Sequence, residues 1–155
     1  MRGLGANFSS TPAIVAPEEE ETRHEIVMKE TNTSVRRFDQ LQLHPKSLKA
    51  LRRQGLHNMT EIQEKSFDII LSGKDVVGRA RTGTGKTISF LLPSLERVVQ
   101  KHQLSNLPTG IAILILSPTR ELAAQIGKAA ERLVAKHGSE ITSQVVYGGS
   151  SRFED

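Results

Sequence analysis

Three observations predict an α/β fold, an open parallel sheet with flanking helices, for this chain of 155 residues. Expected strands at 75–79, 111–116 and 144–147 alternate with helical patterns, which gives the order β-α-β-α-β. The run at 111–116 is continuous and β-branched, as in a strand buried on both faces of a parallel sheet. A glycine-rich loop joins the first run to a helix. Ligands of such sheets bind at the carboxyl ends of the strands, so we expect the functional loops to share one rim.

The chain divides into a tail and a folded part. Residues 1–35 are predicted to be a disordered acidic tail, because glycine, proline and serine interrupt them and Glu18–Glu21 is a run of like charge. Residues 36–155 are predicted to fold, with ordered structure beginning near Phe38. Pro45 and Gly55 bound one expected helix, and Thr60 and Gly73 bound the next. A later helix follows Pro118 and ends at Gly138.

Charge and composition narrow the function classes. Residues 1–34 carry a net charge of −3 and residues 35–155 carry +7, so a basic body follows an acidic arm. Such a body suits a polyanion, most commonly nucleic acid, although a solvated basic surface is an equal alternative on charge alone. The chain has no cysteine, which excludes disulfides and thiolate chemistry. No apolar run is long enough to span a membrane.

The loop from Gly78 to Thr87 has the composition of a phosphate-binding loop. Gly83 and Gly85 permit backbone angles that let amide groups point inward, and the following helix N-terminus adds donors. Lys86 supplies a positive charge for phosphates, and Thr87 supplies a hydroxyl for Mg²⁺. Ala80 replaces the glycine of the strict pattern. The alternative is a glycine-rich turn that binds nothing.

Four motifs in order resemble those of the DEAD-box RNA helicases, over about residues 36–155. Residues 80–87 resemble motif I, residues 118–123 (Pro-Thr-Arg-Glu-Leu-Ala) resemble motif Ia, and residues 147–149 (Tyr-Gly-Gly) resemble the GG motif. Residues 55–63 resemble the Q motif, with Phe38 at the place of its isolated upstream aromatic. The resemblance implies a RecA-like fold and an ATP-dependent RNA helicase. Met59 departs from the usual proline of the Q motif, and Leu56 from a common aromatic.

The resemblance also implies residue roles. Gln63 would read adenine, Phe38 would stack on it, and Thr60 would hold Gln63 and the loop. Lys86 and Thr87 would be the catalytic pair, with Thr87 on the metal. The implied ATP-binding set is Phe38, Thr60, Gln63, Ala80, Arg81, Thr82, Gly83, Thr84, Gly85, Lys86 and Thr87. RNA phosphates would be held by Thr119, Arg120 and Gly149, which gives binding without sequence preference.

Plainer alternatives exist for several of these residues. Gln63 can complete a capping box with Thr60, and Phe38 can be a core aromatic. Arg120 can be a surface arginine, although a cation near a helix N-terminus is unfavourable by itself. The glycines at 148–149 can form only a turn.

Two other classes of function stay open from the sequence. One is a P-loop kinase or other NTPase without a nucleic-acid role, and the other is a non-catalytic nucleic-acid-binding fragment. The sequence contains no Asp-Glu-Ala-Asp, no Ser-Ala-Thr and no second RecA-like lobe, which suggests part of a longer helicase. We therefore expect weak nucleotide binding and no RNA-stimulated hydrolysis from these residues alone.

Overall fold

The computed structural model describes residues 24–27, 33–104 and 110–148. In chain order the elements are β1 (His24–Val27), β2 (Thr33–Arg37), η1 (Phe38–Gln40), α1 (Pro45–Arg53), β3 (Asn58–Thr60), α2 (Glu61–Leu71), β4 (Val76–Arg79), α3 (Lys86–Leu104), α4 (Arg120–Val134) and η2 (Gly138–Glu140).

The described strands form two separate pairs. β1 is parallel to β4, with His24 opposite Val76, and β2 is antiparallel to β3, with Thr33 opposite Thr60. The parallel pair and its flanking helices confirm the predicted α/β class. β4 ends at Arg79, where the glycine-rich loop begins.

Local signals set the boundaries of α1 and α2 as the sequence predicted. Pro45 is the first residue of α1, where its missing N–H costs nothing, and Thr60 directly precedes α2. After one capping residue each, α1 and α2 are followed by glycines at positive φ, Gly55 at 69° and Gly73 at 85°. α4 ends at Val134, before the expected stop at Gly138, which has φ 75° and begins η2. A side chain at these positions would be strained, so the stop signals are physical requirements of the backbone.

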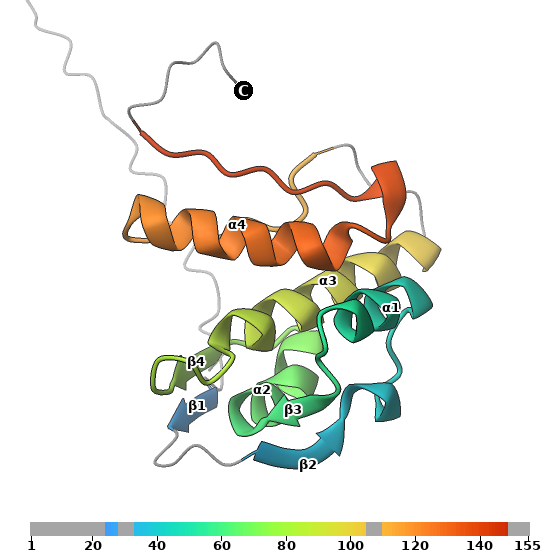
Figure 1. Cartoon of the computed structure of the whole chain (residues 1–155), viewed down its shortest axis with the longest axis vertical. Coiled ribbons are helices and arrows are strands. Elements are labelled where there is room, and N and C mark those ends of the chain that lie inside the picture. The colour runs from blue at the N-terminus through green and yellow to red at the C-terminus, as the bar shows by residue number, and fades with distance from the viewer. Residues whose placement is uncertain (1–23, 28–32, 105–109, 149–155) are drawn as a thin grey trace, which may run out of the picture.

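The helices form two layers that share α3 (Figure 1). α2 contacts α3 on one side, together with β1 and β4, while α4 contacts α3 and α1 on the other. Pro93 lies within α3 and is buried there. The helix that follows the glycine-rich loop is therefore held from both sides.

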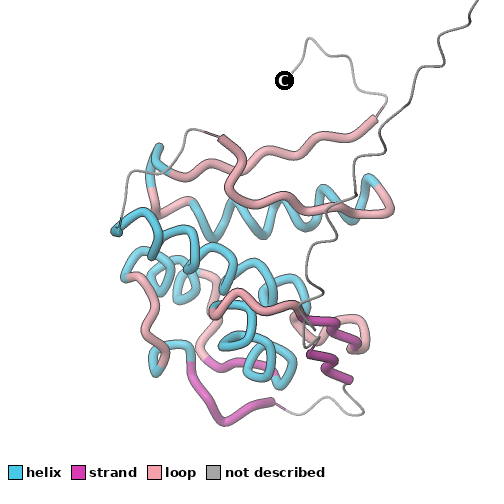
Figure 2. The backbone as a smooth tube through the Cα atoms, turned by 180° about the vertical axis from the view of Figure 1, so that it is seen from behind, coloured by secondary structure: helices cyan, strands magenta, loops and turns pink. Residues whose placement is uncertain are grey.

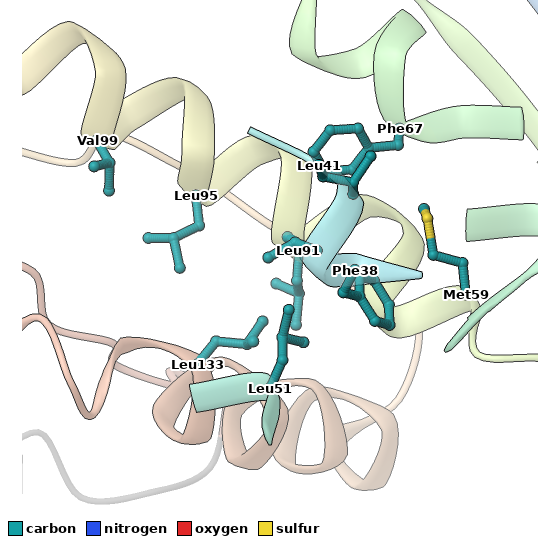
Figure 3. Close-up of a cluster of buried hydrophobic side chains, with 10 residues drawn as sticks. Phe38, Leu41, Leu51, Met59, Phe67, Leu91, Leu95, Val99 and Leu133 are labelled. Carbon is teal, nitrogen blue, oxygen red and sulfur yellow. The ribbon is translucent and has the colours of Figure 1, made fainter. Parts of the chain in front are cut away.

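One hydrophobic core joins the two layers (Figure 3). Leu51 of α1 and Leu133 of α4 point toward Leu91 and Leu95 of α3, which places α4 in the same core as the N-terminal helices. The buried cluster consists of Phe38, Leu41, Leu51, Met59, Phe67, Leu91, Leu92, Leu95, Val99 and Leu133.

The expected strand at 111–116 is not formed, which corrects the prediction of a doubly buried strand. Figure 2 shows this segment as loop, and Ile111 and Leu116 are 84% and 87% exposed. Ile115 alone of the run packs against the core. A strand needs a backbone partner for its N–H and C=O groups, and in the described residues no strand pairs with this run.

The expected strand at 144–147 is also loop, as Figure 2 shows. It follows α4, and the side chain of Val145 lies directly over Gly127 in that helix. Val146 and Tyr147 are exposed. The predicted rim of three strand ends is therefore reduced to one, at β4.

Ordered structure begins earlier than the expected position near Phe38. β1 and the first residues of β2 lie within the segment that the sequence assigned to a tail, and β1 is part of the parallel pair. The acidic run Glu18–Glu21 lies outside the described residues. Among the helices of the described ranges, none is both long and apolar enough to cross a membrane.

Candidate nucleotide-binding site

The glycine-rich loop leaves β4 and enters α3 through two glycines at positive φ. Gly83 has φ 78° and Gly85 has φ 81°. Their surroundings differ, because a Cβ on Gly83 would meet nothing within 4 Å, whereas one on Gly85 would lie 2.4 Å from Gln63 Nε2. Gly85 is thus required by backbone angle and by space, and Gly83 by angle alone.

Gln63 connects the start of α2 to this loop. Its Oε1 accepts a hydrogen bond from the Thr60 N–H at 2.8 Å, and its Nε2 donates to the Gly85 carbonyl at 3.1 Å. The first bond is half of the predicted capping box. The second brings together two residues that the sequence assigned to separate motifs. Both ends of this buried amide are therefore engaged within the protein, with only one assignment of O and N satisfying both partners.

Thr60 presents an unsatisfied polar atom beside the loop. Its methyl carbon would be 3.4 Å from a Cβ on Gly85, so the side chain lies against the loop backbone. Its Oγ1 is buried and has no hydrogen-bond partner among the described residues. A buried hydroxyl without a partner costs free energy, so this atom is suited to bind a ligand group or an ordered water.

Lys86 fills the inside of the loop. Its ammonium donates to the carbonyl oxygens of Ala80 and Arg81, the latter at 2.7 Å. Thr84 Oγ1 donates to the same Arg81 oxygen at 2.8 Å. The side chain expected to bind phosphate is thus satisfied by the loop itself. Thr87, in the first turn of α3, is partly exposed and directly follows it.

Two serines that the sequence analysis did not single out lie where α3 meets α2; the Ser66 bond joins the two helices, and the Ser89 bond lies within α3. Ser66 Oγ donates to the Ser89 carbonyl at 3.1 Å, and Ser89 Oγ donates to the Lys86 carbonyl at 2.6 Å. Both serines are buried. Small polar residues on otherwise apolar helix faces were the available signal. They hold the first turn of α3, and hence the loop, against the helix that carries Gln63.

Phe38 and Met59 lie beside the site but inside the core. Phe38 is 1% exposed, and its N–H donates to the His57 carbonyl at 3.0 Å. No ring face is open for adenine in this arrangement, so the core alternative describes Phe38 here. Met59, one of the departures from the Q motif, is fully buried in the same cluster.

Thr119 and Arg120 begin α4. Thr119 caps the helix, with its Oγ1 accepting from the Leu122 N–H at 3.2 Å. Arg120 is exposed in the first turn of α4, a position that fits both the surface arginine and the RNA-binding alternative. Gly149 lies outside the described residues, and its neighbour Gly148 has open space around its Cα.

A buried polar cluster links α3, α1 and the end of α4. Glu96 Oε2 accepts from the His44 N–H at 2.8 Å, and Ser47 Oγ lies 3.0 Å from His137 Nε2. The rings of His44 and His137 pack with centroids 5.3 Å apart. Burial raises the pKa of the Glu96 carboxyl, while hydrogen bonds from Ser47 and the His44 N–H oppose that rise. The sequence analysis missed this cluster, because its members are far apart along the chain.

Sequence comparison assigns the family. The pattern of the DEAD/DEAH box helicases matches residues 60–155, from the Thr60 cap through the loop to the last residue. The chain belongs to the DEAD/DEAH box helicase family. It is 47% identical over 116 residues to DEAD-box ATP-dependent RNA helicase 26 of Arabidopsis thaliana, covering 74% of this chain and 14% of that protein. Against ATP-dependent RNA helicase HAS1 of Saccharomyces cerevisiae it is 39% identical over 127 residues, covering 81% and 24%.

Solved helicase structures share the fold. The RNA helicase Prp28 of Chaetomium thermophilum, solved with ADP, matches with a TM-score of 0.64 and 34% identity, covering 81% of this chain and 30% of that one. A DEAD-box protein from Methanococcus jannaschii matches with a TM-score of 0.58 and 33% identity, covering 79% and 31%. The RecA-like class is thereby confirmed. This chain spans about a quarter or less of the length of the two curated relatives described above.

Proposed function

We propose that this chain contributes the adenine and phosphate half of the site of an ATP-dependent RNA helicase. One observation supports the proposal: Gln63 bonds both the Thr60 N–H at the start of α2 and the Gly85 carbonyl, so the amide proposed to read adenine is joined to the loop proposed to bind phosphate. A glycine-rich turn without a ligand would not require this hydrogen bond between Gln63 and the Gly85 carbonyl.

Nucleotide binding requires the loop to exchange its internal bonds for bonds to the ligand. Lys86 leaves the carbonyls of Ala80 and Arg81 for phosphate oxygens, and the Thr60 hydroxyl gains a partner. Gln63 exchanges at least one of its two bonds for the adenine edge. Thr87 would offer its hydroxyl to Mg²⁺, an ion that prefers oxygen ligands. The bound metal supplies charge neutralisation for phosphoryl transfer.

RNA binding is proposed for the N-terminus of α4. Arg120 and Thr119 begin this helix, and Gly149 completes the implied grip on the RNA backbone. An exposed cation at a helix N-terminus is unfavourable without an anion, and a phosphate removes that cost.

Isothermal titration calorimetry with ATP and Mg²⁺, and fluorescence anisotropy with a labelled oligouridine, test this division. We expect Gln63→Ala to weaken ATP binding and Arg120→Ala to weaken RNA binding while leaving ATP binding unchanged. Equal effects of both variants on ATP binding would overturn the division. An adenine reader also discriminates against GTP, and effective competition by GTP would favour a general P-loop NTPase.

ATP hydrolysis is proposed to need catalytic groups beyond these 155 residues, which contain no Asp-Glu-Ala-Asp motif. These 155 residues are expected to bind nucleotide weakly and to show no RNA-stimulated release of phosphate. Measurable RNA-dependent turnover by the purified chain would contradict this expectation. A non-catalytic RNA-binding fragment, the alternative function, would bind oligouridine equally with and without ATP and Mg²⁺.

A further inference from the structure

A groove lies between the C-terminal ends of α1 and α4, on residues that have no part in the proposed nucleotide or RNA contacts. It has a volume of about 680 Å³. Three cationic side chains, three apolar ones and one amide line it: Arg53, Arg132, Lys136, Ala50, Leu56, Ala135 and Gln54. We call this the basic groove.

The walls of the basic groove are fixed in place. On the α1 side, Gly55 adopts positive φ and its N–H bonds the Arg52 carbonyl at 3.1 Å, so the chain turns sharply at the helix end. The Leu56 N–H then bonds the Leu51 carbonyl at 3.0 Å. This closure returns Leu56 to the end of α1. A preformed wall lowers the entropic cost of binding a ligand.

The α4 wall is pinned to α1 by a buried contact. His137 follows α4 and is 2% exposed, and its Nε2 lies 3.0 Å from Ser47 Oγ in α1. The His137 N–H also bonds the Val134 carbonyl at 2.7 Å. This contact joins the two helix ends that border the groove.

The charge of the basic groove is of one sign. Within the described parts of the chain, Arg53, Arg132 and Lys136 form no ion pair, since the pairs found there join other residues. Helix dipoles favour cations near C-terminal ends, which accounts for Arg53 and Arg132. Lys136 lies beyond the last turn of α4. The lining therefore contains three cationic side chains and no carboxylate, which makes it complementary in charge to an acidic ligand.

The aliphatic residues of the groove indicate which kind of acidic ligand it fits. Ala50, Leu56 and Ala135 are aliphatic, and none of the lining residues is aromatic. The groove has no aromatic ring on which bases could stack, and a nucleic acid bound through its phosphates alone would leave this aliphatic lining without a partner. A lining that combines aliphatic side chains with three cations fits a peptide that carries leucine-type side chains between glutamates or aspartates.

We propose that the basic groove is a docking site for an acidic, leucine-containing segment of a partner protein. The partner's carboxylates pair with Arg53, Arg132 and Lys136, and its aliphatic side chain enters the hollow above Leu56. Such a site lies outside the nucleotide loop and would recruit the chain to a partner independently of ATP. Its failure would leave the proposed helicase function untouched.

The probe is a fluorescein-labelled peptide, Gly-Glu-Leu-Glu-Glu-Leu-Glu-Gly, titrated with the whole chain and followed by anisotropy. Each of Arg53→Gln, Arg132→Gln and Lys136→Gln is expected to weaken binding roughly two- to fivefold, and the triple variant about tenfold or more. Lys128→Gln is the matched control, because Lys128 is exposed on α4 but does not line the groove. Urea unfolding midpoints confirm that each variant is folded.

Several outcomes would overturn the proposal. Absence of binding up to about 1 mM peptide excludes a useful affinity. Equal binding of a peptide with glutamine in place of glutamate excludes recognition of charge. Loss of oligouridine binding in the triple variant, with the acidic peptide unaffected, would make the groove an RNA site. Self-association of the chain that the triple variant abolishes would make a second copy the occupant.

Discussion

Two apolar, β-branched runs of this chain adopt different structures. Val76–Arg79 pairs with His24–Val27 as a parallel strand, whereas residues 111–116 remain loop with Ile111 and Leu116 largely exposed. The second run is longer and more apolar than the first. Composition therefore does not decide which run becomes a strand, and a neighbouring backbone to complete the hydrogen bonds does.

The largest test of this comparison substitutes one leucine in each region. Leu51→Ala removes a side chain that is fully buried between α1, α3 and α4, and is expected to cost about 2–5 kcal/mol of unfolding free energy. Leu116→Ala, at an exposed position, is expected to change it by less than about 0.5 kcal/mol. Urea unfolding followed by far-ultraviolet circular dichroism measures both. Equal losses would mean that residues 111–116 are buried in solution.

The loops that follow the two kinds of run also differ. Gly85, after β4, has positive φ and would place a Cβ against Gln63, whereas Gly148 has open space and no positive φ. Left-handed backbone strain alone costs about 1–2 kcal/mol of unfolding free energy, and Gly83→Ala is expected to lose about this amount. Gly85→Ala is expected to lose more, because its Cβ also meets Gln63. Gly148→Ala should be close to neutral. A ranking of unfolding free energies in any other order would contradict the fitted loop.

The Glu96 cluster tests how firmly α3 and α1 are joined. Glu96→Ala removes the acceptor of the His44 N–H and is expected to cost about 1–3 kcal/mol, because that buried donor loses its partner. Glu96→Gln keeps an acceptor and is expected to be no less stable than the parent at pH 8.

The raised pKa of Glu96 sets the direction of the pH dependence. The Glu96 carboxyl keeps its proton to higher pH in the folded state than in the unfolded state, in which its pKa is near 4.5. The contribution of Glu96 to stability is therefore fully present below that pH and is lost as pH rises through the folded pKa. Urea unfolding of the parent and Glu96→Gln at pH 5 and pH 8 should show this loss in the parent alone. An identical pH difference in both proteins would exclude Glu96 as its source.

The features that were predicted correctly from the sequence are those that depend only on residues close together along the chain, such as helix boundaries. Pro45, Gly55, Thr60 and Gly73 bound helices through their own backbone chemistry, and those boundaries are confirmed. β1 was missed because its partner is far along the chain. The prediction of a strand at 111–116 was wrong. An apolar pattern indicates that burial is favourable, but it does not indicate whether a partner strand lies beside the run.

The candidate site divides in the same way. The capping bond between Gln63 and Thr60 was an expected alternative, and it forms. The bond from Gln63 to Gly85 depends on how α2 packs against α3, and no local pattern contains that information. Burial of Phe38 was left open for the same reason, since an aromatic residue suits a core and a ligand equally.

The last test concerns Gly127, where the side chain of Val145 lies over α4. Replacing a mid-helix glycine by alanine ordinarily stabilises a protein by about 1 kcal/mol. At Gly127 the added Cβ would lie 2.1 Å from Val145 Cγ2, and a β-branched side chain yields little. Gly127→Ala should therefore destabilise the chain by about 1 kcal/mol or more. Gly127→Ala combined with Val145→Ala, which clears the space, should recover the helix propensity gain. Stabilisation by Gly127→Ala alone would show that the side chain of Val145 does not pack on α4 in solution. Residues 144–147 would then lack side-chain packing on α4 as well as the strand pairing that their sequence predicts.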